Sequence, residues 1–262
     1  MSSWLEGKHV AITGASSGIG AALARELGRS GARLTLVARR RELLVTLASE
    51  IGAGCAVVSH DLSQPAQVLD WIAPAEAAAG APIDVLVNNA GIENTGPVSS
   101  SDVEGATRLL HTNLHAPLLM TRHLLPAMLA RKSGLIVQIA SVAALAPPPR
   151  QAWYGASKAG LAAFSEALRG ELRGSGVGVV TVYPGPVRTA MAEAGYAAYG
   201  GRKGLVKILP EGTPEVLAVR IRRAIERRSA RVIYPRFYTI ARLFPWLVRW
   251  LVDSAKLPPA AE

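Results

Sequence analysis

Cysteine is almost absent from this sequence of 262 residues: Cys55 is the only one. No disulfide can therefore form within the chain. Such a chain fits a reducing compartment. Cys55 begins an apolar run, so we expect a buried thiol with a structural role. The first six residues show neither the basic nor the apolar segment of a secretory signal, and we expect a cytoplasmic protein.

Acidic and aromatic residues are also scarce. The 19 Asp and Glu residues stand against 29 Lys and Arg, a formal net charge of +10, and aromatics make up 5% of the chain. A basic balance fits nucleic acid, an anionic membrane or a phosphorylated cofactor, or serves solubility alone. The arginines do not alternate with aromatic residues as in stacking surfaces, and no nucleic-acid-binding module is recognisable, so we expect no nucleic-acid partner.

Clusters of metal ligands and Ser-His-Asp arrangements are missing as well. His111 and His115 stand one helical turn apart, but neither they nor His60 and His123 have further ligands at zinc-binding spacing. We therefore predict no metal site.

The hydrophobic residues, half of the chain, recur in short β-branched runs separated by alanine- and leucine-rich stretches with helical spacing. Apolar strands that alternate with helices indicate a parallel sheet covered on both faces. We predict a Rossmann-like, doubly wound α/β fold in a single domain (1–235), followed by a C-terminal extension (236–262). The predicted strands are Val10–Thr13, Leu34–Val37, Ala56–Ser59, Val85–Val87, Leu135–Ile139, Val177–Val182 and Val232–Tyr234.

A glycine-rich turn with the pattern T-G-x-x-x-G-x-G follows the first predicted strand, and a helix-like stretch, Ala21–Ser30, comes next. Glycines at a strand-to-helix turn let the backbone approach a phosphate, whose charge the helix N-terminus favours. Alone, this turn fits a structural role equally well. After the first strand of a βα alternation, it indicates a nucleotide.

Tyr154 and Lys158 stand four residues apart, and Ser141 precedes Tyr154 by thirteen residues. On a helix, the first two share one face. An ammonium near a phenol favours the phenolate, so we predict that the pKa of Tyr154 lies below its usual value of about 10. A tyrosine of that kind suits acid/base work on a carbonyl and its alcohol. Singly, Ser141 also fits a helix N-cap, and Tyr154 a core residue.

Together, six motifs between Gly7 and about Pro235 resemble those of the short-chain dehydrogenase/reductase family, in its single-domain branch. They are Thr13-Gly14-x-x-x-Gly18-Ile19-Gly20, Asn88-Asn89-Ala90-Gly91, Asn113, Ser141, Tyr154-x-x-x-Lys158 and Pro184-Gly185-x-x-x-Thr189.

The resemblance implies an oxidoreductase in which Tyr154 donates a proton in reduction and accepts one in oxidation. Lys158 would lower the pKa of Tyr154 and hold the nicotinamide ribose, Ser141 would position the substrate oxygen, and Asn113 would bind a proton-relay water. It also implies a homodimer or homotetramer. The cofactor-binding residues that it implies are Gly14, Ser16, Ser17, Gly18, Ile19, Gly20, Arg39, Asp61, Leu62, Asn88, Ala90, Gly91, Tyr154, Lys158, Pro184, Gly185, Val187 and Thr189.

The cofactor choice depends on the residues after the second predicted strand, Ala38 and three arginines. An NAD binder usually has an acidic residue here for the ribose 2′-hydroxyl, whereas an arginine accommodates a 2′-phosphate. Ala38 leaves the acidic position empty, and Arg39 supplies a charged, planar donor. We predict NADP(H), bound through Arg39. Alternatively, these arginines only form the solvent-exposed N-terminus of the next helix. We prefer this interpretation for Arg41 and leave it open for Arg40.

The segment Ala190–Gly201, which forms a substrate lid in the family, is apolar, aromatic and rich in glycine, without a cluster of cations. We therefore expect a small hydrophobic ketone or aldehyde and its alcohol as substrates, with the stiff loop Pro147–Arg150 as one wall of the pocket. The alternative function is a non-catalytic NADP-binding sensor or membrane-associated scaffold. The complete set of catalytic residues argues against it.

The tail Phe237–Val252 is rich in aromatics, and arginines interrupt it so that no uncharged run exceeds six residues. It is too interrupted to span a bilayer. We prefer packing on its own domain or on another subunit. The alternative is peripheral contact with the inner membrane face, with Trp246 and Trp250 at headgroup depth and upstream arginines attracting anionic lipid.

Overall fold

The computed structural model describes residues 4–199, 201 and 209–254; Gly200 of the predicted lid and residues 1–3 and 255–262 of the predicted domains lie outside the described residues. The chain forms one seven-stranded parallel sheet with the order β3-β2-β1-β4-β5-β6-β7. The predicted doubly wound fold is confirmed. The strands are β1 (His9–Thr13), β2 (Arg33–Ala38), β3 (Cys55–Ser59), β4 (Val85–Asn88), β5 (Gly134–Ile139), β6 (Val177–Pro184) and β7 (Arg231–Tyr234).

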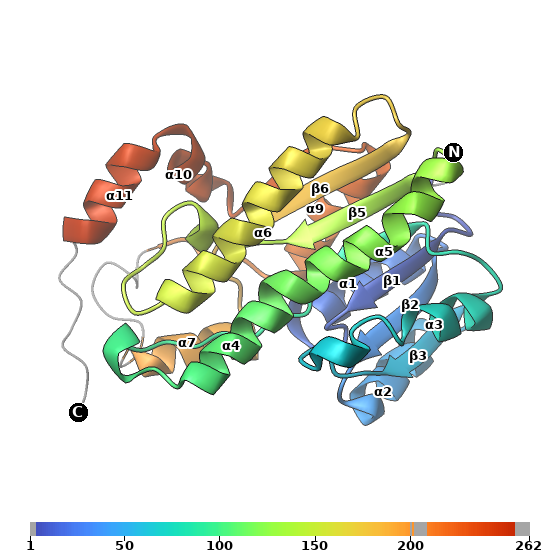
Figure 1. Cartoon of the computed structure of the whole chain (residues 1–262), viewed down its shortest axis with the longest axis horizontal. Helices are drawn as coiled ribbons and strands as arrows, with labels where there is room; N and C mark the ends of the chain where they lie inside the picture. The colour runs from blue at the N-terminus through green and yellow to red at the C-terminus, as the bar shows by residue number, and fades with distance from the viewer. Residues whose placement is uncertain (1–3, 200, 202–208, 255–262) are drawn as a thin grey trace.

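Helices cover both faces of this sheet, as Figure 1 shows. A π-helical turn, His111–His115, joins two of them. The helices are α1 (Gly18–Arg29), α2 (Arg41–Ile51), α3 (Ile72–Ala79), α4 (Val103–Leu110), α5 (Ala116–Ala130), α6 (Ala152–Glu171), α7 (Ala190–Ala198), α9 (Pro214–Glu226), α10 (Ile240–Leu243) and α11 (Pro245–Ser254).

Two hydrophobic cores lie on the two faces, because successive strand residues point in opposite directions. Val10 and Ile12 of β1 belong to the core beneath α1, α2 and α9. Ala11, between them, belongs to the core beneath α3, α5 and α6. Every residue of β1 is therefore buried. This burial explains why the strands appear in the sequence as continuous apolar runs.

The strand order reverses between β1 and β4, where the chain returns from β3 to the centre of the sheet. Ligands of open α/β sheets bind outside the carboxyl ends of the strands at such a reversal. The loops after β1, β4 and β5 all leave the sheet at these carboxyl ends. The topology thus brings together the glycine turn, the Asn88–Gly91 motif and Ser141.

Cys55 begins the edge strand β3 and is half-buried, so the expectation of a buried thiol holds only in part. Its burial raises the pKa of the thiol to about 11. The thiol therefore stays protonated at neutral pH, as a structural residue does.

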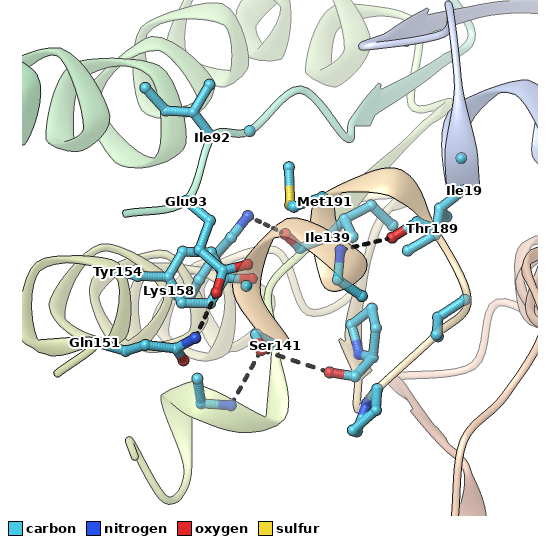
Figure 2. A pocket seen from close by; sticks show the side chains of 18 of the residues that line it. Ile19, Ile92, Glu93, Ile139, Ser141, Gln151, Tyr154, Lys158, Thr189 and Met191 are labelled. Carbon is cyan, nitrogen blue, oxygen red and sulfur yellow. Dashed lines mark hydrogen bonds between the residues drawn. The ribbon is translucent and has the colours of Figure 1, made fainter. Parts of the chain in front are cut away.

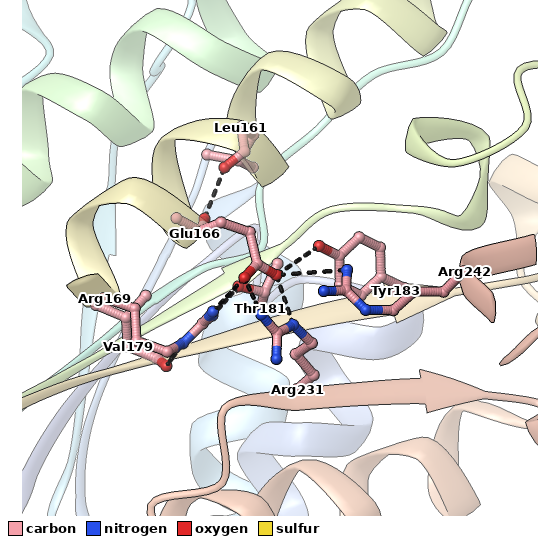
Figure 3. A network of polar contacts seen from close by, with 9 residues as sticks. Leu161, Glu166, Arg169, Val179, Thr181, Tyr183, Arg231 and Arg242 are labelled. Atoms are coloured by element: carbon pink, nitrogen blue, oxygen red, sulfur yellow. Dashed lines mark hydrogen bonds and ion pairs between the residues drawn. The ribbon is translucent and has the colours of Figure 1, made fainter. Parts of the chain in front are cut away.

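A cluster of charges around Glu166 ties α6 to the end of the sheet, as Figure 3 shows. Its carboxylate pairs with Arg169 at 2.6 Å, with Arg231 of β7 and with Arg242 of α10 at 3.6 Å. Tyr183 of β6 donates a hydrogen bond to it at 3.1 Å. Desolvation raises the pKa of Glu166, but the hydrogen bond from Arg231 and the neighbouring charges outweigh it and lower the pKa to about 2.

We predict that Glu166→Gln lowers the free energy of unfolding by about 1–3 kcal/mol at neutral pH, because it removes charge-assisted hydrogen bonds. The folded pKa lies below the unfolded value, so the stabilisation is complete above the unfolded pKa of 4.5 and is lost as pH falls toward about 2. Denaturant unfolding at neutral and acidic pH checks this. Glu171→Gln, an exposed carboxylate on the same helix, serves as the control and should change stability by less than about 0.5 kcal/mol. Equal losses in both variants would contradict the prediction.

Candidate active site

The glycine turn between β1 and α1 presses closely against the end of β4. Gly14 and Gly18 have positive φ angles of 65° and 56°. A Cβ at Gly14 would lie 2.7 Å from the Cα of Ala90, so the turn leaves no room for a side chain there. Ser17, at the N-cap of α1, makes no capping hydrogen bond with its side chain. The N-terminal N–H groups of α1 are therefore open to a phosphate.

Hydrogen bonds join this turn to the residues after β4. The Thr13 hydroxyl accepts from the backbone N–H groups of Asn89 at 3.0 Å and Ala90 at 3.1 Å. The Asn89 amide donates to the carbonyls of Thr13 at 3.0 Å and Gly14 at 3.1 Å. Asn89 also lines the cavity described below. The family resemblance implies that residues 88–91 line the adenosine ribose side of the site, and Asn89 belongs to that motif.

Two arginines and a histidine stand where β2 and β3 end. Arg40 donates to the hydroxyls of Ser16 and Ser17, each at 2.9 Å, so its guanidinium lies against the glycine turn. Arg39 also lines the cavity. Desolvation raises the pKa of Asp61, but the hydrogen bonds with Ser63 and the charges of Arg39 and His60 outweigh it, so the pKa is lowered. His60 has a buried Nε2 atom that finds no hydrogen-bond partner among the described residues. Polar groups thus gather at this end of the cavity.

Ser141, Tyr154 and Lys158 meet beside the end of β5, as Figure 2 shows. Ser141 follows β5, and the other two side chains come from the first turns of α6. Lys158 is 4% exposed, donates to the carbonyl of Ile139 at 2.9 Å, and has its Nζ 5.9 Å from the centre of the Tyr154 ring. Ser141 accepts from the backbone N–H of Ala143 at 3.1 Å. Ser141 therefore caps a short turn and also faces the phenol.

The pKa of Tyr154 differs from the sequence-based expectation. Burial and, to a smaller extent, the carboxylate of Glu93 raise it to about 12, although a hydrogen bond with Ser141 acts to lower it. Burial also lowers the pKa of Lys158 to about 8, and Glu93 opposes that change. The prediction of a depressed tyrosine pKa is wrong for the protein alone, because desolvation of the phenol and the charge of Glu93 outweigh the hydrogen bond with Ser141. The protein by itself therefore holds the phenol in its protonated form.

Three predicted site residues lie behind the cavity wall. Asn113, in the π-helical turn, accepts from the N–H of Ile92 and donates to its carbonyl, both at 2.8 Å. Asn88 donates to Gln138 at 2.9 Å and is 1% exposed. A Cβ at Gly20 would lie 2.3 Å from the Gly14 carbonyl oxygen, so this glycine lets α1 approach the turn. These residues position the wall and do not line the cavity.

The other predicted residues all line one cavity of about 1500 Å³, which runs along this edge of the sheet. One end lies at the arginines, and the other lies between α7, the proline loop and α11. Tyr199 donates to the carbonyl of Pro149 at 2.6 Å and so ties the lid to that loop. The predicted residues in the lining are Gly14, Ser16, Ser17, Gly18, Ile19, Arg39, Asp61, Leu62, Ala90, Gly91, Ser141, Tyr154, Lys158, Pro184, Gly185, Val187 and Thr189.

Helix α11 has one face on the cavity and one face exposed. Val248 and Val252 line the cavity, whereas Trp246 and Trp250 are 70% and 62% exposed on the opposite face. Among the described residues, no helix has the length and apolarity needed to cross a membrane. Sequence analysis also missed Glu93 and Gln151, which line the cavity near Tyr154. Glu93 stands two residues after the Asn88-Asn89-Ala90-Gly91 motif, but no spacing rule assigns a role to that position.

The cavity fits the nicotinamide dinucleotide expected from the sequence. The glycine turn forms a cradle that a Cβ at Gly14 would fill, and the N-terminus of α1 opens onto it. The arginines after β2 offer positive charge near that cradle, and the unpartnered Nε2 of His60 offers a polar contact. Tyr154 and Lys158 stand farther along the same cavity, where hydroxyl groups of a ribose need polar partners.

Comparisons with known proteins agree with this geometry. A model of the short chain dehydrogenase family matches residues 8–199. Ketoacyl reductase HetN of Nostoc sp. is 35% identical over 233 residues, which cover 87% of this chain and 79% of HetN.

Two solved structures are similar throughout. A short-chain dehydrogenase from Sphingobium yanoikuyae in complex with NADPH has 29% identity and a TM-score of 0.79, over 97% of this chain and 99% of that one. A 3-ketoacyl-(acyl-carrier-protein) reductase from Brucella melitensis, complexed with NADH, has 28% identity and a TM-score of 0.77, over 88% and 97%. The chain therefore belongs to the short-chain dehydrogenase/reductase family of oxidoreductases.

Proposed function

We propose that this oxidoreductase uses NADP(H) to interconvert a hydrophobic ketone or aldehyde and its alcohol. The observation that carries the proposal is the meeting of Ser141, Tyr154 and Lys158 in one cavity with the glycine turn and the arginines. The lining from α7 and α11 is mainly apolar, with Met191, Val248 and Val252 among its residues. An apolar pocket with a few converging polar groups suits a hydrophobic carbonyl compound.

In this mechanism, the Ser141 hydroxyl and the Tyr154 phenol hold the substrate oxygen between them. Tyr154 donates its proton to that oxygen in reduction and accepts one from the alcohol in oxidation. The hydride would come from, or return to, a nicotinamide cofactor bound in this cavity. The Lys158 ammonium stabilises the phenolate that forms when the proton leaves. Asn113 fixes the backbone of Ile92 and so positions the wall opposite Lys158.

The preference for NADP(H) over NAD(H) rests on the end of β2. Arg39 and Arg40 are both exposed, and Ala38 supplies no carboxylate for a ribose 2′-hydroxyl. One guanidinium nitrogen of Arg40 donates hydrogen bonds to two serine hydroxyls. The Arg39 guanidinium makes no such hydrogen bond among the described residues. Arg39 is therefore the residue best placed to bind a 2′-phosphate, with Arg40 beside it.

Peripheral membrane contact is a further proposal, supported by the two faces of α11. Trp246 and Trp250 lie one turn apart on the outer face, and Leu243 of the preceding helix α10 is also 66% exposed. Tryptophan suits the headgroup region, and the net charge of +10 favours anionic lipid. The inner face of the same helix lines the cavity, so a lipophilic substrate in the membrane would lie close to its mouth.

Tyr154→Phe should lower kcat by about 100- to 10,000-fold, because it removes the general acid and leaves the ring in place. NADPH affinity, measured by cofactor fluorescence, should stay within about twofold. Turnover with a lipophilic ketone tests the first part. A variant that keeps its activity would contradict the proposal, and a wild type that binds NADPH without any turnover would favour the sensor or scaffold.

Arg39→Ala should weaken NADPH binding by about ten- to a hundredfold, the worth of one or two charge-assisted hydrogen bonds. NADH binding should change by less than about twofold, because NADH has no 2′-phosphate. Titrations followed by cofactor fluorescence measure both. Arg41→Ala is the matched control, since Arg41 is exposed and does not line the cavity. Equal effects on both cofactors would overturn the role of Arg39.

Replacement of Trp246 and Trp250 by alanine should lower binding to anionic phosphatidylserine vesicles by at least about tenfold at low salt, because each buried aromatic side chain contributes to insertion. Vesicle co-sedimentation of the full chain measures this. Val103→Ala on α4 is the control, because that side chain is 71% exposed but distant from the tail in the sequence. The membrane proposal fails if the wild type does not sediment with these vesicles.

A further inference from the structure

Glu93 brings a carboxyl group into the cavity beside the reacting residues, and the mechanism above does not use it. Among the described residues, the acidic side chains that line the cavity are Asp61, at the adenosine end, and Glu93. Figure 2 shows Glu93 reaching toward Tyr154 and Lys158 from the loop after β4. Its charge acts on both of these groups. Glu93 therefore lies where a substrate meets the catalytic residues.

Several contacts fix the position of this carboxyl group. Asn113 holds the preceding residue, Ile92, through both of its backbone polar groups. Gln151, at the start of α6, donates a hydrogen bond to Oε1 of Glu93, and Thr95 donates to the same atom at 3.4 Å. The position of Glu93 is thus defined by its own loop and by α6.

The lid leaves space for this group. Gly195 lies on α7 directly over Glu93, and a Cβ there would stand 2.9 Å from Oε1 and 3.6 Å from Oε2. Any side chain at this position would push into the carboxyl group or force the lid outward. The glycine therefore lets α7 close over Glu93 while the carboxyl group stays in the cavity.

The second carboxylate oxygen, Oε2, accepts no hydrogen bond from the described residues. A carboxylate offers about four acceptor positions, and the contacts at Oε1 use two of them. Desolvation raises the pKa of Glu93, while Thr95 and then Lys158 lower it. An acceptor held in a partly buried, apolar site gains most from a donor that a ligand brings.

We infer that Glu93 determines substrate specificity: its Oε2 atom accepts a hydrogen bond from a hydroxyl group that the substrate carries next to its reacting carbonyl. This inference rests on the proposed carbonyl reduction. It narrows the substrate class to hydroxyketones whose remaining surface is apolar. It also disfavours substrates with a carboxylate at that position, because two negative charges would meet in a cavity of low polarity.

A different role for Glu93 is to offset the burial of the Lys158 ammonium. That role changes the reactivity of Tyr154 and Lys158 themselves and so affects every substrate by the same factor. A specificity role affects substrates according to the group next to the carbonyl. The two roles are therefore separated by a ratio between matched substrates, which cancels any common change in reactivity.

The test uses acetophenone, 2-hydroxyacetophenone and benzoylformate with the full chain and NADPH. They share a phenyl ketone and carry a methyl, a hydroxymethyl or a carboxylate group beside it. Glu93→Leu, which removes the acceptor at similar size, should lower the kcat/KM ratio of hydroxyketone to plain ketone by about ten- to a hundredfold. Glu93→Gln should lower it less, since an amide oxygen still accepts, and both variants should raise the relative rate with benzoylformate. Glu193→Gln, an exposed carboxylate on α7 that does not line the cavity, should leave all ratios unchanged.

An unchanged ratio in Glu93→Leu would overturn the inference, as would a wild type that binds NADPH but reduces the hydroxyketone no better than the plain ketone. A wild type that binds NADPH and reduces neither ketone would count against the proposed carbonyl reduction and so overturn the inference that rests on it. Failure to bind NADPH would instead refute the proposed function. Cofactor titration therefore accompanies each kinetic measurement and separates the two failures.

Discussion

The contact between the glycine turn and the residues after β4 is the constraint on which the site depends. Thr13 and Asn89 exchange hydrogen bonds of 3.0 Å there, and Gly14 lies too close to Ala90 to carry a side chain. The two strands meet at the reversal of strand order, so their loops diverge in opposite directions and leave a cavity between them. Without this contact, the N-terminus of α1 and the catalytic residues of α6 would not open onto the same space.

A second principle of the site is the placement of three ionisable groups in a largely apolar surrounding. The phenol of Tyr154, the ammonium of Lys158 and the carboxyl group of Glu93 each lie partly or wholly out of water, and burial disfavours the charged form of all three. The pKa values of Tyr154 and Lys158, about 12 and about 8, reflect that cost. Any charge that a ligand brings into the cavity therefore has a large effect on these groups, because little solvent screens it.

The C-terminal extension is part of the site as well as of the surface. Arg242 joins α10 to Glu166, and Glu166 lies on the same helix that carries Tyr154 and Lys158. The following helix, α11, contributes Val248 and Val252 to the cavity. The packing of the extension makes it one wall of the pocket. The shape of the substrate end thus depends on residues outside the family match, which ends at residue 199.

The sequence by itself determined the features that depend on local spacing. Strand alternation gave the sheet and its seven strands, the T-G-x-x-x-G-x-G pattern placed the turn, and the four-residue spacing of Tyr154 and Lys158 put both on one helix face. Only the tertiary structure decided which way side chains point and which charges meet. It turned Asn88 into the core, brought Arg40 to the serines of the glycine turn, and set Glu93 beside Lys158. Periodicity is a property of neighbouring residues, whereas burial and charge interactions depend on segments that are distant in the chain and meet only in the fold.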